Sequence, residues 1–417
     1  MKELIFNRFV LIITAVACSG CLMGTPLQLF AIQMNIAVLL LNFAVFFWVL
    51  LLHIVKRGKI FTGISYTYLL LLSSLPVVAS IIAFSLFGQD LISGFTGNLA
   101  FYNFYIILFH VFYFKFRNNA LNEIKLTIVT LGWISLIVCY FVQVAFPGLE
   151  FTVPSFDGTT TYTYNLYSLG PAFIPWTGMY YLAKYKETAK AKYLLLFFLF
   201  ISYIVVMQNA RAFTLALLLC VIIFYLREFS LKGKWKLGFS IFVLLFISSI
   251  LILAIPQLNN FFSDKVESFQ AALGAASGKE VEEVSANARL LEVNIAYTYI
   301  QDYYLLGVGF LKGNTTEKNI SSYFFASDIG LVGIVFNYGL IGLLLIGYQL
   351  KYFVVEFKNR ILKADTFLLG TAYYMLLRYM LSVTTGELLY SIGLSFMLLG
   401  ILIHGRRNLE GKLAANT

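Results

Sequence analysis

The sequence predicts an all-α polytopic membrane protein with about twelve transmembrane helices and one large helical loop outside the membrane. Of the 417 residues, 60% are hydrophobic and only 12% are charged, about half the charged fraction of a soluble domain. Apolar runs of about 20 residues, enough to cross a hydrocarbon core of about 30 Å as a helix, recur along the chain. Residues 1–417 are therefore expected to form a single membrane domain, with the large loop at residues 256–328 between the ninth and tenth helices.

The first half of the chain is expected to contain six spans. Two of them lie between Phe9 and Val55 and are separated by the turn Gly24-Thr25-Pro26. A polar loop rich in Thr and Tyr, from Pro147 to Tyr167, precedes the sixth span. The other spans are expected at Ile64–Phe87, at Leu99–Phe116, at Leu126–Phe146 and in a helix that ends at Lys184.

The apolar segment Tyr193–Leu226 is 34 residues long and is interrupted by Gln208, Asn209 and Arg211. Basic residues stand on both of its flanks, and loops rich in Lys and Arg stay in the cytoplasm. The segment is therefore predicted to be a hairpin with about 17 residues per leg, the short end of a membrane span. Arg211 would then lie at or below the membrane surface, where an unpaired charge costs about 3 kcal/mol. The alternative, one long helix, would invert every later span.

In the second half of the chain, the large loop is expected to lie outside the membrane between two spans. A helix at Leu237–Ile255 leads into this loop, a helix at Ile329–Leu350 returns from it, and a last hairpin follows at Thr366–His404. This topology places 23 of the 30 Lys and Arg residues inside and 13 of the 20 Asp and Glu residues outside. The net charge of +10 is thus a signal of orientation that puts both termini in the cytoplasm, and it does not indicate nucleic-acid binding.

The large loop contains two helical patterns. The first, at Phe262–Leu273, is amphipathic and is expected to lie on the membrane surface. The second can be capped by Ser285 and is expected to stop near Gly307; in it Arg289 and Glu292 share one face. The same face continues with Ala296 and Tyr299.

Three arginines are candidates for binding an anion: Arg211 at the hairpin turn, Arg289 in the large loop and Arg378 near the turn of the last hairpin. The planar guanidinium binds phosphate oxygens through two parallel hydrogen bonds, so arginines that meet at one membrane face would bind a diphosphate well. The alternatives are structural. Arg289 would pair with Glu292 on the helix surface, and Arg211 would pair with an acidic side chain or a lipid phosphate.

Asp328 stands directly before the helix expected at Ile329–Leu350. A carboxylate there can accept backbone N–H bonds as a helix N-cap, or it can act as a general base. The two roles conflict in part, because capping lowers the pKa of a carboxyl group. Glycines that follow at spacings near three, four and five residues are interpreted as close helix packing: Gly330, Gly333, Gly339, Gly342 and Gly347.

Other chemistries have little support in the sequence. His53, His110 and His404 all fall in or beside hydrophobic helices, which favours packing over catalysis. There is no Asp-x-Asp pair for a metal-bound nucleotide sugar and no Gly-Lys-Thr phosphate-binding loop, so neither a metal nor a cofactor is expected. Cys18 and Cys21 have CxxC spacing but no further ligands nearby, and all four cysteines are interpreted as small buried side chains.

The order of these features resembles the O-antigen ligase and Wzy-type polysaccharide polymerase superfamily of bacterial inner membranes. The shared features are an Arg at a short outer turn, a long outer loop that holds Arg289 and then Leu305-Leu306-Gly307-Val308-Gly309, and a polar residue before Gly339-Leu340-Ile341-Gly342. The resemblance covers Gln208 to Gly342. In the ligases a His stands eleven positions before the first glycine of the Gly-x-x-Gly pair, and here that position is Asp328. This departure favours a polymerase over a ligase.

The resemblance implies a metal-independent glycosyltransferase that joins undecaprenyl-diphosphate-linked oligosaccharides into O-antigen, capsule or exopolysaccharide on the periplasmic face. Arg211 and Arg289 would bind the diphosphate, and Asp328 would deprotonate the attacking hydroxyl. The expected partners are the lipid-linked donor and acceptor, membrane lipid and a chain-length regulator protein. Substrate-binding roles are expected for Arg378, Glu292, Glu387, Tyr297 and Tyr323, although tyrosines also serve as interfacial anchors.

Three alternatives compete with the polymerase. The first is the ligase of the same superfamily. The second is a flippase or transporter of lipid-linked saccharides, in which Arg211, Arg378 and Glu387 would be charges along the transport pathway. The third is a membrane scaffold without catalytic activity.

Overall fold

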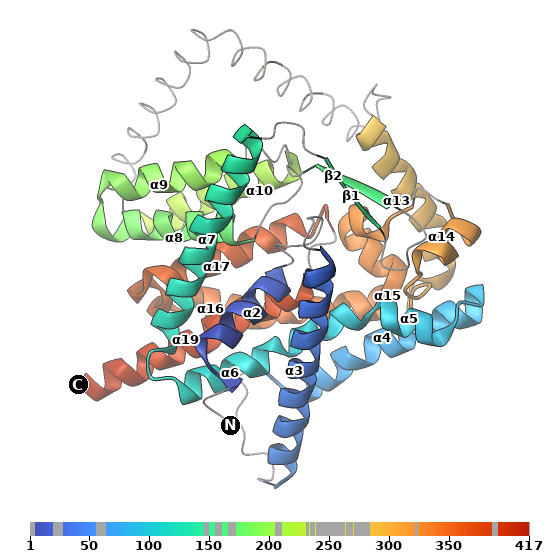
Figure 1. Ribbon diagram of the computed structural model, residues 1–417, viewed down its shortest axis with the longest axis horizontal. Helices are drawn as coiled ribbons and strands as arrows, with labels where there is room; N and C mark the ends of the chain where they lie inside the picture. The colour runs from blue at the N-terminus through green and yellow to red at the C-terminus, as the bar shows by residue number, and fades with distance from the viewer. Residues whose placement is uncertain are drawn as a thin grey trace.

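The computed structural model describes most of the chain as helix. The described ranges are 5–19, 28–55, 64–145, 150–154, 161–165, 172–204, 211–230, 284–321, 324–385 and 391–416, with single positions at 233, 238, 263 and 270. Within them one antiparallel hairpin departs from the all-α prediction; it pairs β1 (Glu150–Pro154) with β2 (Thr161–Asn165) (Figure 1). Three predicted features lie outside the described residues: the helices at Leu237–Ile255 and Phe262–Leu273 and the first part of the 256–328 loop.

Five helices in the described part of the chain are long and apolar enough to cross a membrane, and the protein is a multi-pass membrane protein. The expected number of twelve spans is not confirmed. One physical reason is that the segment predicted as a hairpin at Tyr193–Leu226 contains a helix of only 12 residues, α9 (Ala191–Ser202), before α10 (Arg211–Glu228). The five spans are Ile32–Leu52, Tyr66–Phe87, Leu99–Phe116, Ala120–Val142 and Ala326–Lys358.

The helices of the first half follow the predicted spans closely. The span predicted at Leu99–Phe116 begins as a 3-10 helix, η1, and continues as the α-helix α6. Gly88, in the left-handed conformation, ends the preceding span, and Asp90 then caps a short helix, α5, that was not predicted. The bounds are α2 (Arg8–Ser19), α3 (Gln28–Val55), α4 (Tyr66–Phe87), α5 (Leu91–Gly97), η1 (Leu99–Tyr105), α6 (Ile106–Phe116) and α7 (Ala120–Ala145).

In the main core α8 (Phe173–Thr188) packs on α17 (Thr366–Leu381). Trp176 of α8 is fully buried, donates a hydrogen bond from Nε1 to Oγ1 of Thr371 at 2.9 Å, and stacks on the ring of Tyr374. Gly370 allows the two backbones to approach closely, since a Cβ there would stand 2.7 Å from Cα of Tyr180. The helices after α10 are α13 (Val284–Tyr303), α14 (Gly313–Asn319), η4 (Ala326–Ile329), α15 (Gly330–Gly347), α16 (Gln349–Lys358), η5 (Arg360–Ala364), α17 (Thr366–Leu381) and α19 (Ile392–Asn416).

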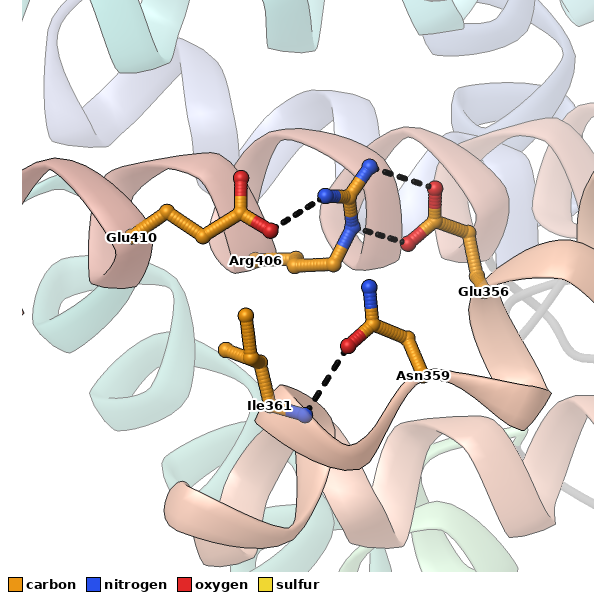
Figure 2. A network of polar contacts seen from close by, with 5 residues as sticks. All are labelled: Glu356, Asn359, Ile361, Arg406 and Glu410. Atoms are coloured by element: carbon orange, nitrogen blue, oxygen red, sulfur yellow. Dashed lines mark hydrogen bonds and ion pairs between the residues drawn. The ribbon is translucent and has the colours of Figure 1, made fainter.

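A partly buried ion-pair network joins α16 to α19 (Figure 2). The guanidinium of Arg406 holds both carboxylate oxygens of Glu356, at 2.6 Å and 3.1 Å, and also reaches Glu410 at 2.5 Å. Beside it, the side chain of Asn359 accepts a hydrogen bond from the amide of Ile361 and so caps η5. The fork geometry and low exposure of the Arg406–Glu356 pair fix the two helices to each other.

At one end of the molecule α13, α14 and α15 lie close to α4 and α5 (Figure 1). A second, small hydrophobic core forms there, separate from the main core of the spans. It connects α13 with η4 and the first turns of α15. Its buried members are Ala296, Val308, Phe324, Ile329 and Phe336.

Candidate functional site

One face of α13 packs inward as its periodicity predicts. Ala296 is fully buried and Glu292 is 5% exposed, whereas Arg289, one turn earlier, is exposed. The helix begins at Val284, so Ser285 lies within its first turn and does not precede it as a cap. In the described part of the chain no ion pair joins Arg289 to Glu292, so the structural alternative for Arg289 is not supported.

The carboxylate of Glu292 reaches across to the segment that carries η4. Its Oε1 accepts a hydrogen bond from the amide of Phe325 at 3.2 Å, while its Oε2 is buried and has no hydrogen-bond partner among the described residues. Burial raises the pKa of Glu292 above its ordinary value; the Phe325 amide opposes this, the charge of Asp328 adds to it and Arg289 opposes it. Asp328 and Arg289 therefore both lie within electrostatic reach of Glu292.

Asp328 is exposed on η4, and its carboxylate is not used to cap a helix. The N-cap position of α15 is Ile329, and no side chain caps the helix there. Oδ1 of Asp328 accepts a hydrogen bond from the hydroxyl of Ser327 at 3.0 Å, and the amide of Asp328 donates to the carbonyl of Phe325 at 3.0 Å. The alternative role of Asp328 as the N-cap of α15 is therefore wrong, and its carboxylate is free of capping bonds that would conflict with a role as a general base.

Arg378 lies in the last turn of α17 and is 7% exposed. The chain just beyond it reaches the start of α15, because a Cβ on Gly330 would stand 2.7 Å from the carbonyl carbon of Val383. Gly330 has a φ of +56° and follows Asp328 by two residues. The end of α17 therefore lies next to the segment that carries Asp328.

The remaining predicted residues are only partly placed. Arg211 is the first residue of α10, but its side chain lies outside the described residues. Tyr323 and Glu387 also lie outside them. Tyr297 is 59% exposed on α13, where it could contact either a sugar or the membrane surface. The roles of all these side chains stay predictions.

A backbone junction between two segments is the feature that sequence reasoning missed. Helix α15 is broken at Gly339, where φ is +64°. The break frees two carbonyls and two amides, and the segment after α13 satisfies all four. Val308 and Gly309 donate to the carbonyls of Phe336 and Asn337 at 2.8 Å and 3.1 Å, while Leu340 and Ile341 donate to the carbonyls of Tyr304 and Leu305 at 2.8 Å and 3.2 Å.

The same segment is also seated on α4. A Cβ on Gly309, whose φ is +87°, would stand 2.6 Å from the amide nitrogen of Ala83. The buried side chain of Gln89 accepts a hydrogen bond from the amide of Lys312 at 2.8 Å and donates one to the carbonyl of Phe310 at 2.9 Å. Residues 305–312 therefore attach α13 to two membrane spans, which fixes the position of Arg289 relative to Asp328.

The described residues contain no group of three His, Cys, Asp or Glu side chains placed to hold a metal ion. His110 and His404 are buried in α6 and α19, and Nδ1 of His110 lies 3.0 Å from the carbonyl of Ile106. The charged groups that act on Glu292 are thus the guanidinium of Arg289 on α13 and the carboxyl group of Asp328 on η4. Such groups can bind an anion and accept a proton.

Comparison with known proteins supports the resemblance seen in the sequence. Residues 196–347 match the family model Wzy_C, described as O-antigen ligase. This stretch contains Arg211, Arg289 and Asp328, together with the junction at Gly339. The resemblance to the O-antigen ligase and Wzy superfamily is therefore confirmed over this part of the chain. None of the curated proteins matches the chain.

Proposed function

We propose, from the match of residues 196–347 to the O-antigen ligase family, that the protein is a glycosyltransferase that polymerises undecaprenyl-diphosphate-linked oligosaccharide repeats into O-antigen, capsule or exopolysaccharide. It would lie in a bacterial inner membrane with both termini in the cytoplasm. The reaction would take place on the periplasmic face, where both lipid-linked substrates meet. The single observation that carries the proposal is the grouping of Arg289, Glu292 and Asp328 between α13 and η4.

The reaction requires a cation, a base and access from the membrane. The acceptor hydroxyl oxygen attacks the anomeric carbon of the donor, and the bond from that carbon to the diphosphate oxygen breaks with its electron pair. Arg289 and Arg211 would stabilise the charge that develops on the departing diphosphate. Asp328, which is exposed and makes no cap, would take the proton of the acceptor hydroxyl. The products are a longer lipid-linked saccharide and free undecaprenyl diphosphate.

The other site residues would bind the saccharides. Arg378 lies in α17, whose end approaches the start of α15, so it is suited to hold a charged or polar part of the donor. Tyr297, Tyr323 and Glu387 are assigned to sugar binding. A chain-length regulator protein is the expected protein partner, because chain growth has no built-in end point in this reaction.

A ligase is the second candidate, because the matched family model carries that description. A ligase would transfer a finished chain to a different acceptor, whereas a polymerase would extend the chain on its lipid carrier. In the sequence, Asp328 stands eleven positions before Gly339, where the ligases would have a His, and this departure supports the polymerase. A flippase would form no covalent product, so the assay below separates all three.

The test uses the purified full chain in lipid nanodiscs with synthetic lipid-linked repeat units. A ladder of longer lipid-linked products identifies a polymerase. Arg289→Ala should lower the rate by about 100-fold to 1,000-fold, and Asp328→Asn by about 100-fold or more. Asp302→Asn, an exposed carboxylate at the far end of α13, is the matched control and should keep the wild-type rate. Wild-type rates in both site variants would contradict the proposal.

A further inference from the structure

Glu292 and Arg289 share a face of α13, yet the helix buries the carboxylate and exposes the guanidinium. A carboxylate that is 5% exposed on a helix face is costly, because burial disfavours the charged form. Structures retain such groups where the carboxylate makes a specific contact. The contact made here is the hydrogen bond from the amide of Phe325 to Oε1.

This hydrogen bond is the first of two that lead from α13 to Asp328. Phe325 is the N-cap residue of η4, and its carbonyl accepts the hydrogen bond from the amide of Asp328 at 3.0 Å. Glu292 thus holds the amide of Phe325, while the carbonyl of the same residue, in the next peptide unit, accepts the hydrogen bond from Asp328. Phe324 and Ile329, on either side, are buried in the small core with Ala296, so the segment is fixed at both ends and by Glu292 between them.

We propose that Glu292 is a positioning residue that holds the Phe325–Asp328 segment against α13, so that the carboxylate of Asp328 is presented beside Arg289. Glu292 would then align Asp328, the base for the acceptor hydroxyl, with Arg289, which binds the diphosphate of the donor. Glu292 does not contact the substrates in this arrangement, because the residue is 5% exposed, its Oε1 is bonded to the Phe325 amide and its Oε2 is buried. The inference rests on the proposed function, since it assigns Asp328 and Arg289 to the same reaction.

The charge environment agrees with a role in alignment. Asp328 on η4 and Arg289 on α13 are the charged groups that act on Glu292, and their effects on its pKa are opposite in sign. The neutral carboxyl can still accept the Phe325 amide, because one of its oxygens stays an acceptor when the other carries a proton. Holding the segment therefore needs an acceptor oxygen and not a negative charge.

Two variants of nearly equal size separate these possibilities. Glu292→Gln keeps an acceptor oxygen for Phe325 and removes the charge, whereas Glu292→Met fills the same space and removes the acceptor. We expect Glu292→Gln to keep kcat within about 3-fold of the wild type, since its alignment is preserved. We expect Glu292→Met to lower kcat by about 100-fold with little change in KM, because the misplaced base affects the chemical step more than binding.

Hydrogen exchange of the peptide that contains residues 324–329 provides a readout that does not depend on activity. Exchange at this peptide should be faster in Glu292→Met and unchanged in Glu292→Gln, both compared with Asp302→Asn. If Glu292→Gln is as inactive as Glu292→Met while its exchange is unchanged, the charge itself is required and the positioning role is wrong. A fully active Glu292→Met overturns it as well. Failure of the proposed function has a different signature, in which Arg289→Ala and Asp328→Asn keep the wild-type rate.

Discussion

Gly307 and Gly339 meet backbone to backbone, so that a Cβ atom on Gly307 would stand 2.6 Å from the amide nitrogen of Gly339. Both residues have positive φ angles, +73° and +64°, a conformation that side chains disfavour. The contact replaces one turn of α15 by hydrogen bonds to residues 304–309. An irregular backbone in a membrane span is tolerated where every freed group finds a partner, and here all four do.

Alanine at either glycine should therefore destabilise the protein strongly. The left-handed conformation and the backbone overlap together should cost about 2 to 5 kcal/mol for Gly307→Ala or Gly339→Ala. Gly347→Ala is the matched control, because no atom lies within 4 Å of the added Cβ and the residue is helical. Thermal unfolding of the purified proteins in detergent checks the difference. Equal melting temperatures for all three variants would show that the junction does not form.

The helix α13 was predictable from the sequence, whereas the backbone pairing of Gly307 with Gly339 was not. Residues 289, 292, 296 and 299 repeat at helical spacing, and the predicted helix is confirmed as α13; Glu292 and Ala296 are buried, whereas Arg289 is exposed. Close packing was predicted for five glycines and is wrong for Gly347, where no atom lies within 4 Å of an added Cβ; the partner of Gly339 lies in a segment about 30 residues earlier. No local pattern specifies such a pairing, because backbone hydrogen bonds do not depend on side-chain identity.

The burial of Glu292 could not be predicted from the local sequence pattern either. Glu292 was expected to bind substrate, and nothing in its neighbours indicates that the Phe325 amide would take its carboxylate. The hairpin of β1 and β2 did have a signal, since Thr161 to Tyr164 alternate β-branched and aromatic residues. That signal was assigned to a loop. The N-cap alternative for Asp328 was wrong because Asp328 lies inside η4 and α15 begins at Gly330. The N-cap position of α15 is therefore Ile329, one residue later than expected.

Loss of Arg406 alone should destabilise the protein, whereas replacement of both Arg406 and Glu356 by apolar residues should not. Arg406→Ala leaves Glu356, whose side chain is 5% exposed, without its partner, and removing one member of a buried pair costs about 3 to 5 kcal/mol. Changing both residues to Met should restore most of this loss. Arg360→Ala, an exposed cation on η5, serves as the control. Thermal unfolding of the four proteins is the measurement, and a double variant no more stable than Arg406→Ala would contradict the prediction.

Stability should depend on pH through Glu292. Its pKa is raised above the ordinary value of 4.5 by burial and by Asp328, against the opposing effects of the Phe325 amide and Arg289. The folded state therefore binds the proton more tightly than the unfolded state does. The stabilisation is fully present below pH 4.5 and is lost as pH rises through the folded-state pKa.

The variant Glu292→Gln removes this titration and should flatten the dependence. The melting temperature of the wild type, minus that of Glu292→Gln, should fall between pH 4 and neutral pH, with Asp302→Asn as the control for an exposed carboxylate. A constant difference across this range would mean that Glu292 has the same pKa in both states.

The two-pronged hydrogen bonding of the Arg289 guanidinium can be distinguished from the effect of its positive charge. Arg289→Lys keeps the positive charge but loses the planar fork that binds two phosphate oxygens together. We expect Arg289→Lys to reduce kcat by about 10-fold to 100-fold, less than Arg289→Ala, with the loss in the step that releases diphosphate. Lys318→Gln on α14, which removes an exposed cation, should keep the wild-type rate and shows whether general positive charge matters.

Inhibition by inorganic diphosphate gives the second measurement. The inhibition constant should increase in parallel with the loss of rate across Arg289→Lys and Arg289→Ala, because the same guanidinium binds the inhibitor and the leaving group. If the inhibition constant stays constant while the rate falls, Arg289 acts on another part of the substrate. A rate in Arg289→Lys equal to that of the wild type would mean that a positive charge at this exposed position of α13 is sufficient.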